Sequence, residues 1–153
     1  MYARWHIFTS LSSPLPIFCV CIGSAIVDIE VISTEETKEP KKGEISYFPA
    51  EIKQRAGGVA RNHAEALARL GIDVDLISAF GIDLNGDKDI GATFLFKKLE
   101  GLENLDFSHS LFTKECSTAT SVSIESKKVS LSIYLSETNL RVFSKDLLMS
   151  KFC

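Results

Sequence analysis

The stretch AGGVARNHAEALARLG, residues 56–71, places two adjacent glycines before an alanine-rich segment with helical periodicity. A helix that serves structure alone normally begins at a Ser, Thr or Asp cap, whereas Gly57 and Gly58 carry no side chains. Glycines let a ligand or a neighbouring strand approach the main chain closely. The free amide groups at the start of the following helix favour oxygen-rich ligands. The spacing therefore predicts a close approach at this turn, by a ligand or by another strand.

Two polar side chains have the chemistry to bind hydroxyl groups beside this turn. Asn62, in the first helical turn, offers both a hydrogen-bond donor and an acceptor, and it lies off the apolar stripe. Asp28 follows the first apolar strand and can accept hydrogen bonds from two neighbouring hydroxyls. With Gly57 and Gly58 they form a predicted sugar-binding site at the carboxyl ends of parallel strands. The alternative is structural: a Gly-Gly turn, a capping Asn and a solvated Asp.

The surrounding segments predict an α/β domain with a parallel sheet. The apolar run at 17–22 is typical of a strand buried on both faces. A second strand at 73–81 follows the helix and completes a strand–helix–strand order. The helix carries a stripe of small residues that suits close packing on a sheet, and Gly71 is its expected stop. The other predicted elements are extended stretches at 26–32 and 45–54, the latter an edge strand because of Pro49, a hairpin around Lys127-Lys128, and helices at 90–102 and 144–152.

The bulk composition excludes several classes of protein. The chain has 153 residues, of which 45% are hydrophobic and 24% charged, and this fits one globular domain. A net charge of −3 gives no electrostatic reason to bind nucleic acid. No apolar run is long enough to span a membrane. His6, His63 and His109 are scattered and no Cys-x-x-Cys occurs, so we predict no metal site, reduced cysteines and a cytoplasmic protein.

Several of these segments together resemble a known family. GGVARNHA at 57–64, with the glycines that follow at Gly71 and Gly81, is similar to the first signature of the PfkB (ribokinase-like) family of carbohydrate and nucleoside kinases. VCIGSAIVDI at 20–29 resembles the opening strand of that family and its sugar-binding aspartate. GIDLNGDKDIG at 81–91 resembles the Gly-x-Asp-x-x-Gly loop that follows. The resemblance extends from about residue 17 to the C-terminus after an irregular leader at 1–16, and KKVSLSIYLSETNLRVFSKDLL is similar to pseudouridine kinases.

The resemblance implies a Rossmann-like three-layer α/β/α domain with a small β-sheet lid over the sugar. The lid would come from 26–32, 45–54 and the hairpin at 120–135. Family members transfer the γ-phosphate of ATP, with Mg²⁺, to a sugar hydroxyl, and many form homodimers through the lid. Carried over by position, the four predicted binding residues would hold the hydroxyls of a small sugar or nucleoside.

The sequence also departs from the family pattern. Ile26 stands where family members often have Asn, and Glu137-Thr138-Asn139 stands where pseudouridine kinases have Asp-Met-Asp, so the identity of the sugar stays open. The second family signature, a Gly-Ala-Gly-Asp turn with the anion hole and the catalytic aspartate, is absent, since the last glycine is Gly101.

We therefore expect residues 17–153 to form the N-terminal, sugar-binding part of a kinase domain whose C-terminal half is missing. Such a chain would contain no catalytic residue, would bind ATP and Mg²⁺ poorly, and would expose a sheet edge and an uncovered apolar face. A non-catalytic binding or dimerisation module derived from the kinase is the alternative. A dinucleotide-binding oxidoreductase fragment is disfavoured because the fingerprint glycines after the first strand are lacking.

Overall fold

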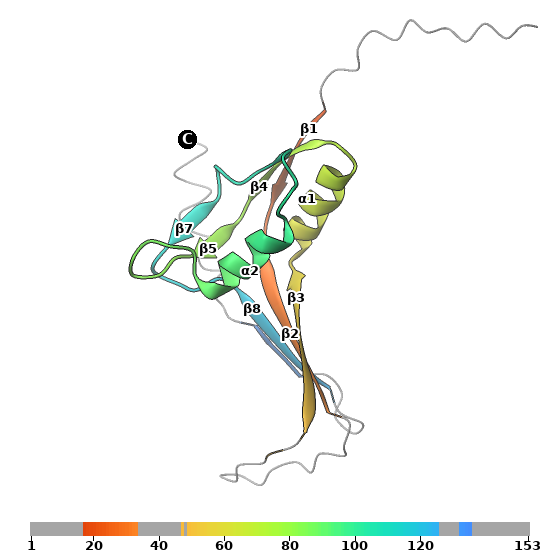
Figure 1. Cartoon of the computed structure of the whole chain (residues 1–153), viewed down its shortest axis with the longest axis vertical. Helices are drawn as coiled ribbons and strands as arrows, with labels where there is room; N and C mark the ends of the chain where they lie inside the picture. The colour runs from red at the N-terminus through yellow and green to blue at the C-terminus, as the bar shows by residue number, and fades with distance from the viewer. Residues whose placement is uncertain (1–16, 34–46, 48, 126–131, 136–153) are drawn as a thin grey trace, which may run out of the picture.

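The computed structural model describes residues 17–33, 47, 49–125 and 132–135 of the chain. Figure 1 shows an α/β body from which a second group of long strands projects. The helices and strands, in chain order, are β1 Phe18–Ile22, β2 Ile26–Ser33, β3 Ala50–Gly57, α1 Val59–Arg69, β4 Asp73–Ile77, β5 Ala79–Gly81, α2 Ile90–Lys98, β6 Leu105–Asp106, β7 Leu111–Thr113, β8 Thr120–Glu125 and β9 Ser132–Leu135. The predicted leader at 1–16 and the predicted helix at 144–152 lie outside the described residues.

The α/β body contains a parallel sheet with strand order β1-β4-β6 and a parallel pair β5-β7. The predicted strand at 73–81 is divided at Ser78 into β4 and β5. The N–H of Ser78 donates to Ser110 Oγ at 3.0 Å, and this hydroxyl donates to Leu76 O at 2.6 Å. The Ser110 side chain therefore takes the place of backbone hydrogen bonds between strands at this point. Beyond it the chain continues into the second pair of strands. The predicted α/β class with a parallel sheet is confirmed.

Helix α1 packs on this sheet through the predicted stripe of small residues. The buried Ala60, Ala64 and Ala68 lie in one apolar cluster with Val74 and Leu76 of β4. The helix ends as expected near Gly71, whose φ is +83°, a conformation that favours glycine. Small side chains on this face let the helix pack closely on the strands.

The opposite face of β1 is open, and the prediction that this strand is buried on both faces is wrong for the described residues. Cys19 and Cys21 are partly buried against the α1 side. Phe18, Val20 and Ile22 alternate with them and are 61, 49 and 50% exposed. No described helix packs on that face, so these three side chains form an exposed apolar surface, and the second helical layer of the three-layer fold stays a prediction.

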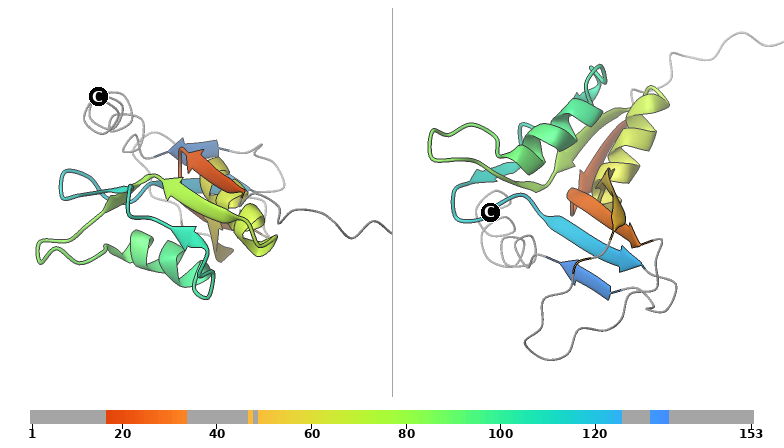
Figure 2. Two further views of the ribbon diagram at one scale, coloured as in Figure 1. Left: turned by 90° about the horizontal axis from the view of Figure 1, so that it is seen from above. Right: turned by 60° about the horizontal axis from the view of Figure 1, so that its bottom comes forward.

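A four-stranded sheet with order β3-β2-β8-β9 forms the projecting part (Figure 2). Strand β2 pairs antiparallel with β3 and parallel with β8, and β8 pairs antiparallel with β9, as expected for the lid and its hairpin. Strand β3 is an edge strand, as Pro49 predicts, but it spans Ala50–Gly57 and so continues directly into the glycine turn. Two of the predicted site residues, Asp28 and Gly57, therefore lie on neighbouring strands of the lid sheet.

Helix α2 is shorter than predicted and joins the lid to the body. It ends at Lys98 rather than at residue 102, before Gly101 with φ +86°. Asp89 caps its start by accepting the N–H of Ala92 at 2.7 Å. Its buried residues lie in a second apolar cluster that joins β2, β5 and α2: Ala25, Val27, Phe80, Ala92 and Leu95. None of the described helices has the length and apolar character needed to cross a membrane.

Candidate functional site

Gly58 forms the tight turn between β3 and α1, and its neighbour is another part of the chain. It is the N-cap of α1 with φ +94°, and a Cβ there would lie 2.3 Å from Ser24 O and 2.7 Å from Ala25 Cα. The N–H of Arg61 donates to the same Ser24 oxygen at 3.3 Å. Of the two predicted alternatives, close approach by a neighbouring segment explains Gly58. One of the helix N–H groups expected to be free is also used by this contact.

Gly57 is required for a different reason, which involves Asp28. A Cβ on Gly57 would lie 1.8 Å from Oδ2 and 2.7 Å from Cγ of Asp28. Strands β2 and β3 are paired so that Ile26 faces Gly57, and Asp28 is two residues further along. The carboxylate therefore occupies the volume that any larger residue at position 57 would fill. Two of the four predicted binding residues are in direct contact.

The electrostatic surroundings of Asp28 are mixed, and burial dominates them. Burial raises the pKa of the Asp28 carboxyl, a hydrogen bond from Ser121 of β8 and the charge of Arg61 lower it, and the charge of Glu30 raises it again. The net direction is upward from the ordinary value of an aspartate. A carboxylate that has lost part of its water is a strong acceptor for the hydroxyls of a ligand.

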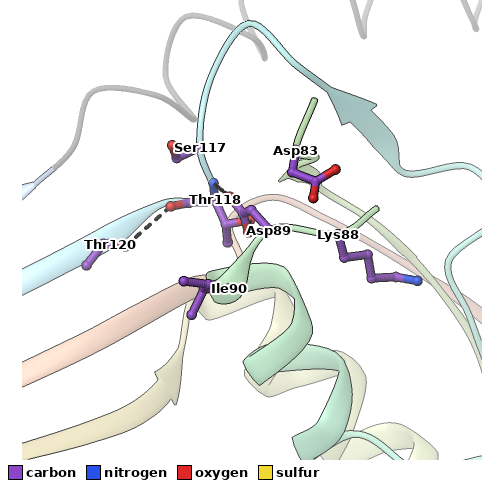
Figure 3. Close-up of a pocket in the computed structure, with 8 residues that line it drawn as sticks. Asp83, Lys88, Asp89, Ile90, Ser117, Thr118 and Thr120 are labelled. Carbon is purple, nitrogen blue, oxygen red and sulfur yellow. Dashed lines mark hydrogen bonds between the residues drawn. The ribbon is translucent and has the colours of Figure 1, made fainter. Parts of the chain in front are cut away.

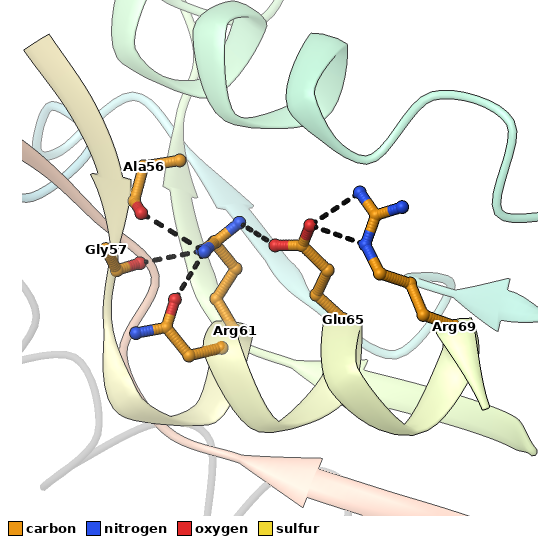
Figure 4. Close-up of polar contacts among 6 residues, drawn as sticks. Ala56, Gly57, Arg61, Glu65 and Arg69 are labelled. Atoms are coloured by element: carbon orange, nitrogen blue, oxygen red, sulfur yellow. Dashed lines mark hydrogen bonds and ion pairs between the residues drawn. The ribbon is translucent and has the colours of Figure 1, made fainter.

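Arg61, absent from the predicted set, contacts the end of β3 at the glycine turn (Figure 4). Its side chain is buried, with the residue 5% exposed. The guanidinium donates from Nε to Gly57 O at 3.0 Å and from Nη2 to Ala56 O at 3.1 Å. These bonds fix the last carbonyls of β3 and the position of the turn. One pattern in the sequence could have indicated this role: Arg61 lies beside the alanine stripe, and Glu65 follows four residues later, a spacing that favours an ion pair on one helix face.

Glu65 balances the charge of Arg61 and connects it to Arg69. Oε2 of Glu65 lies 2.7 Å from Arg61 Nη1, and Oε1 accepts from Arg69 Nη2 at 2.7 Å and Nε at 2.9 Å. Burial raises the pKa of Glu65, but the hydrogen bonds and charges of Arg69 and Arg61 outweigh it and hold that pKa below its ordinary value. Glu65 therefore stays ionised and orients the buried guanidinium.

Asn62 lies on the exposed side of the same turn. Its N–H donates to Gly58 O at 2.9 Å, and its Oδ1 accepts from Nη2 of Arg61. Arg61 connects Asn62 to Asp28, because its guanidinium donates to the amide oxygen and its charge lowers the pKa of the carboxyl. The structure thus places all four predicted residues around one turn, with Asp28 against Gly57 and Asn62 at the rim.

A separate pocket of about 510 Å³ opens at the start of α2 (Figure 3). Asp89 accepts the N–H of Thr118 at 2.7 Å through Oδ2 and its hydroxyl at 2.7 Å through Oδ1, and the N–H of Gly81 donates to that hydroxyl at 3.0 Å. The lining residues are Asp83, Lys88, Asp89, Ile90, Gly91, Ser117, Thr118 and Thr120. None of the four predicted binding residues is among them.

The pocket and Asp28 lie on opposite faces of the lid strands. In β8, Thr120 lines the pocket, whereas the next residue, Ser121, is bonded to Asp28. Successive residues of a strand point to opposite faces, so the two polar regions are separated by the sheet. Either face could receive a ligand, and the two possibilities are distinguishable by experiment.

The comparisons with known proteins identify the family. Residues 17–150 match the family described as pfkB family carbohydrate kinase. The chain belongs to the pfkB family. No curated protein matches it.

Among solved structures, a putative sugar kinase from Clostridium perfringens aligns with a TM-score of 0.68 at 22% identity, covering 91% of this chain and 40% of that one. Ribokinase from Cryptococcus neoformans in complex with ADP gives 0.60 at 23%, covering 80% and 35%. A nucleoside kinase from Methanocaldococcus jannaschii, described as an archaeal member of the ribokinase family, gives 0.62 at 20%, covering 82% and 38%. These likenesses show the ribokinase-like fold, and the pfkB-family chain spans 40% or less of each of these structures.

Proposed function

We propose that this pfkB-family chain carries the sugar-binding part of a carbohydrate or nucleoside kinase, with Asp28 as the main acceptor for sugar hydroxyls. The contact of the Asp28 carboxylate with the bare Gly57 supports this proposal most strongly. That contact places a partly desolvated carboxylate at the turn that begins α1.

The neighbouring groups complete the proposed site. Asp28 accepts hydrogen bonds from two adjacent hydroxyls, while Ser121 orients the carboxylate from the next strand. Gly57 leaves room for the Asp28 carboxylate at the turn, Gly58 lets the Ser24–Ala25 segment pack against it, and Asn62 at the exposed rim provides a further donor. In a kinase these groups would hold the sugar in place for phosphoryl transfer, and positioning of this kind is a large part of phosphoryl-transfer catalysis.

The described residues do not fit the nucleotide. A phosphate group is commonly bound at a helix N-terminus. At the start of α1 the N–H of Arg61 donates to Ser24 O, and at the start of α2 the carboxylate of Asp89 accepts the N–H of Ala92. We therefore assign no step involving ATP or Mg²⁺ to these residues. The ADP complex of the cryptococcal ribokinase is consistent with ATP use by longer family members.

The finer part of the proposal concerns the substrate. We infer a ribose-containing nucleoside, with pseudouridine as the first candidate, because the segment 127–148 is similar to pseudouridine kinases. The archaeal nucleoside kinase shows that proteins of this fold include nucleoside kinases. Ribose, adenosine and pseudouridine are the three ligands to compare.

Calorimetric titration of the full 153-residue chain and three variants tests the proposal. Asp28→Asn and Asn62→Ala are expected to weaken binding of the preferred ligand by about tenfold or more, since each removes a hydrogen bond to a polar ligand. Glu51→Gln, which changes an exposed carboxylate of the same lid sheet, is the matched control and should bind normally. Unchanged affinity in Asp28→Asn would refute the assignment. A coupled assay with ATP should give no turnover, and clear turnover would refute the statement that this chain lacks nucleotide-handling residues.

A non-catalytic binding or dimerisation role is the second candidate. The edge strand β3 carries Ile52, which is 69% exposed, and the open face of β1 is apolar. Both features suit association with a second copy through the lid or with a longer relative. Light scattering coupled to size-exclusion chromatography would show a concentration-dependent dimer, and a strictly monomeric chain would contradict the lid dimer.

We also propose a cytoplasmic location, consistent with the free thiols of Cys19, Cys21 and Cys116.

A further inference from the structure

The structure brings together three potential metal ligands that are distant from the proposed sugar site. Asp75 of β4 and Asp106 of β6 are direct partners in the parallel register, and His109 lies in the turn that leads to β7. One ligand atom from each residue lies within 4.8 Å of the others. We propose that Asp75, Asp106 and His109 form a binding site for a divalent transition-metal ion, with Zn²⁺ as the best match.

Asp75 supplies the observation that points to a ligand. The residue is 4% exposed, and its Oδ1 has no hydrogen-bond partner among the described residues. Its other oxygen lies 2.7 Å from Nδ1 of His109. A buried carboxylate oxygen without a partner is costly, because it has lost its water without replacement. A cation at this point would satisfy it.

Asp106 is already oriented by its own turn. Its Oδ1 accepts the N–H groups of Phe107 at 2.7 Å and Ser108 at 2.9 Å, and its Oδ2 accepts the Ser108 hydroxyl at 2.7 Å. That hydroxyl also lies 3.3 Å from Nδ1 of His109. Outer contacts of this kind orient metal ligands, and a carboxylate retains further lone pairs for an ion.

The types of ligand atom in this cluster determine which ion fits it. Imidazole with two carboxylates suits Zn²⁺, whereas Mg²⁺ and Ca²⁺ prefer oxygen ligands alone. Zn²⁺ bonds of about 2.0–2.2 Å in a tetrahedral site separate ligand atoms by roughly 3.3–3.5 Å. The His109–Asp75 contact would therefore open slightly, so that Nδ1 and the Asp75 carboxylate, with its unpaired Oδ1, both face the ion. A water molecule would complete four ligands, since the imidazole is 61% exposed at the side chain and leaves the site open to solvent.

The location gives the ion a structural role. Val74 and Leu76 face α1 in the core, so Asp75 between them faces the open side of the sheet, next to Val20 of β1. An ion there would join β4, β6 and the turn before β7 on a face that no described helix covers. The proposal does not depend on the proposed kinase function.

Calorimetric titration of the full chain with Zn²⁺ tests the proposal. We expect one ion per chain, and His109→Ala should weaken its affinity by about tenfold or more. His63→Ala, which removes an exposed histidine on α1, is the matched control and should leave the affinity unchanged. Since thiolates also bind zinc, Cys21→Ser is a second control and should likewise bind normally.

Thermal unfolding provides a second readout that does not depend on Asp75 variants, which risk misfolding. Zn²⁺ should raise the unfolding midpoint of the wild type and of His63→Ala, and should have little effect on His109→Ala. The circular dichroism spectrum of His109→Ala without metal should match that of the wild type, because the ring is largely exposed. Absence of Zn²⁺ binding by the wild type, equal affinity in His109→Ala, or loss of binding in Cys21→Ser alone would overturn the proposal.

Discussion

Replacement of Gly58 by alanine gives the sharpest test of the glycine turn. The φ of +94° is a conformation that other residues rarely adopt, at a cost of about 1–3 kcal/mol. The new Cβ would also lie 2.3 Å from Ser24 O and 2.7 Å from Ala25 Cα, and both are backbone atoms that cannot rotate away. Overpacking of this kind costs about a further 1–3 kcal/mol. The sum, about 2–6 kcal/mol, is a large part of the stability of an ordinary domain, about 5–15 kcal/mol.

Gly71→Ala separates the two contributions. Gly71 has a similar φ of +83°, but nothing lies within 4 Å of a Cβ there. It should therefore lose only the conformational part, about 1–3 kcal/mol. Urea unfolding of the wild type and both variants, followed by circular dichroism, measures the difference at a shared m-value. Equal destabilisation of the two variants would refute the conclusion that the Ser24–Ala25 segment requires glycine at position 58.

Three further predictions concern other parts of the structure. Arg61→Met should destabilise the fold by about 2–5 kcal/mol, because it leaves two carbonyls and Oε2 of the partly buried Glu65 without their donor. The exposed Arg69→Met should cost less than about 1 kcal/mol in the same urea assay. The raised pKa of Asp28 means that the folded state holds this proton more tightly than the unfolded state, so the carboxylate costs stability as pH rises above its ordinary pKa. Asp28→Asn should therefore be the more stable protein at neutral pH and should converge with the wild type in acid; identical pH profiles of the unfolding midpoint would contradict this. Val20→Thr removes apolar surface from the open face and should reduce light scattering of the concentrated chain; unchanged scattering would show that another surface causes association.

Local signals in the sequence predicted the elements that depend on neighbours along the chain. The alanine stripe and Gly71 predicted the packing face and the end of α1, and Pro49 predicted an edge strand. Turn chemistry and periodicity act over a few residues, so they can be read without knowledge of the fold. The same holds for Asn62, whose exposed position at the helix start follows from periodicity alone.

Contacts between distant segments could not be predicted in this way. The need for glycine at position 58 is explained by Ser24, which is more than thirty residues away in sequence. This contact forms only because the fold brings the segment after β1 to the end of β3. The break at Ser78 depends on the Ser110 hydroxyl. His109 meets Asp75 only because β6 and β4 pair in register, so scattered histidines gave no sign of a shared site.

The open face of β1 shows a further limit of periodicity. A continuous apolar run predicts burial on both faces, and this assumes that something covers each face. In the described residues, α1 covers the side of Cys19 and Cys21, and the side of Val20 stays exposed. The sequence of a strand indicates which of its faces are apolar. Whether a helix or strand covers each face depends on other segments of the chain.

Chemical-shift mapping by NMR tests most directly whether a sugar binds on the Asp28 face of the lid. The isotopically labelled full chain would be titrated with pseudouridine, adenosine and ribose. Binding at the proposed site predicts the largest amide shifts at Gly57, Gly58, Asn62 and Ser121. Shifts confined to Gly91 and Thr118, in the pocket on the other face, or no shifts with any of the three ligands, would contradict it.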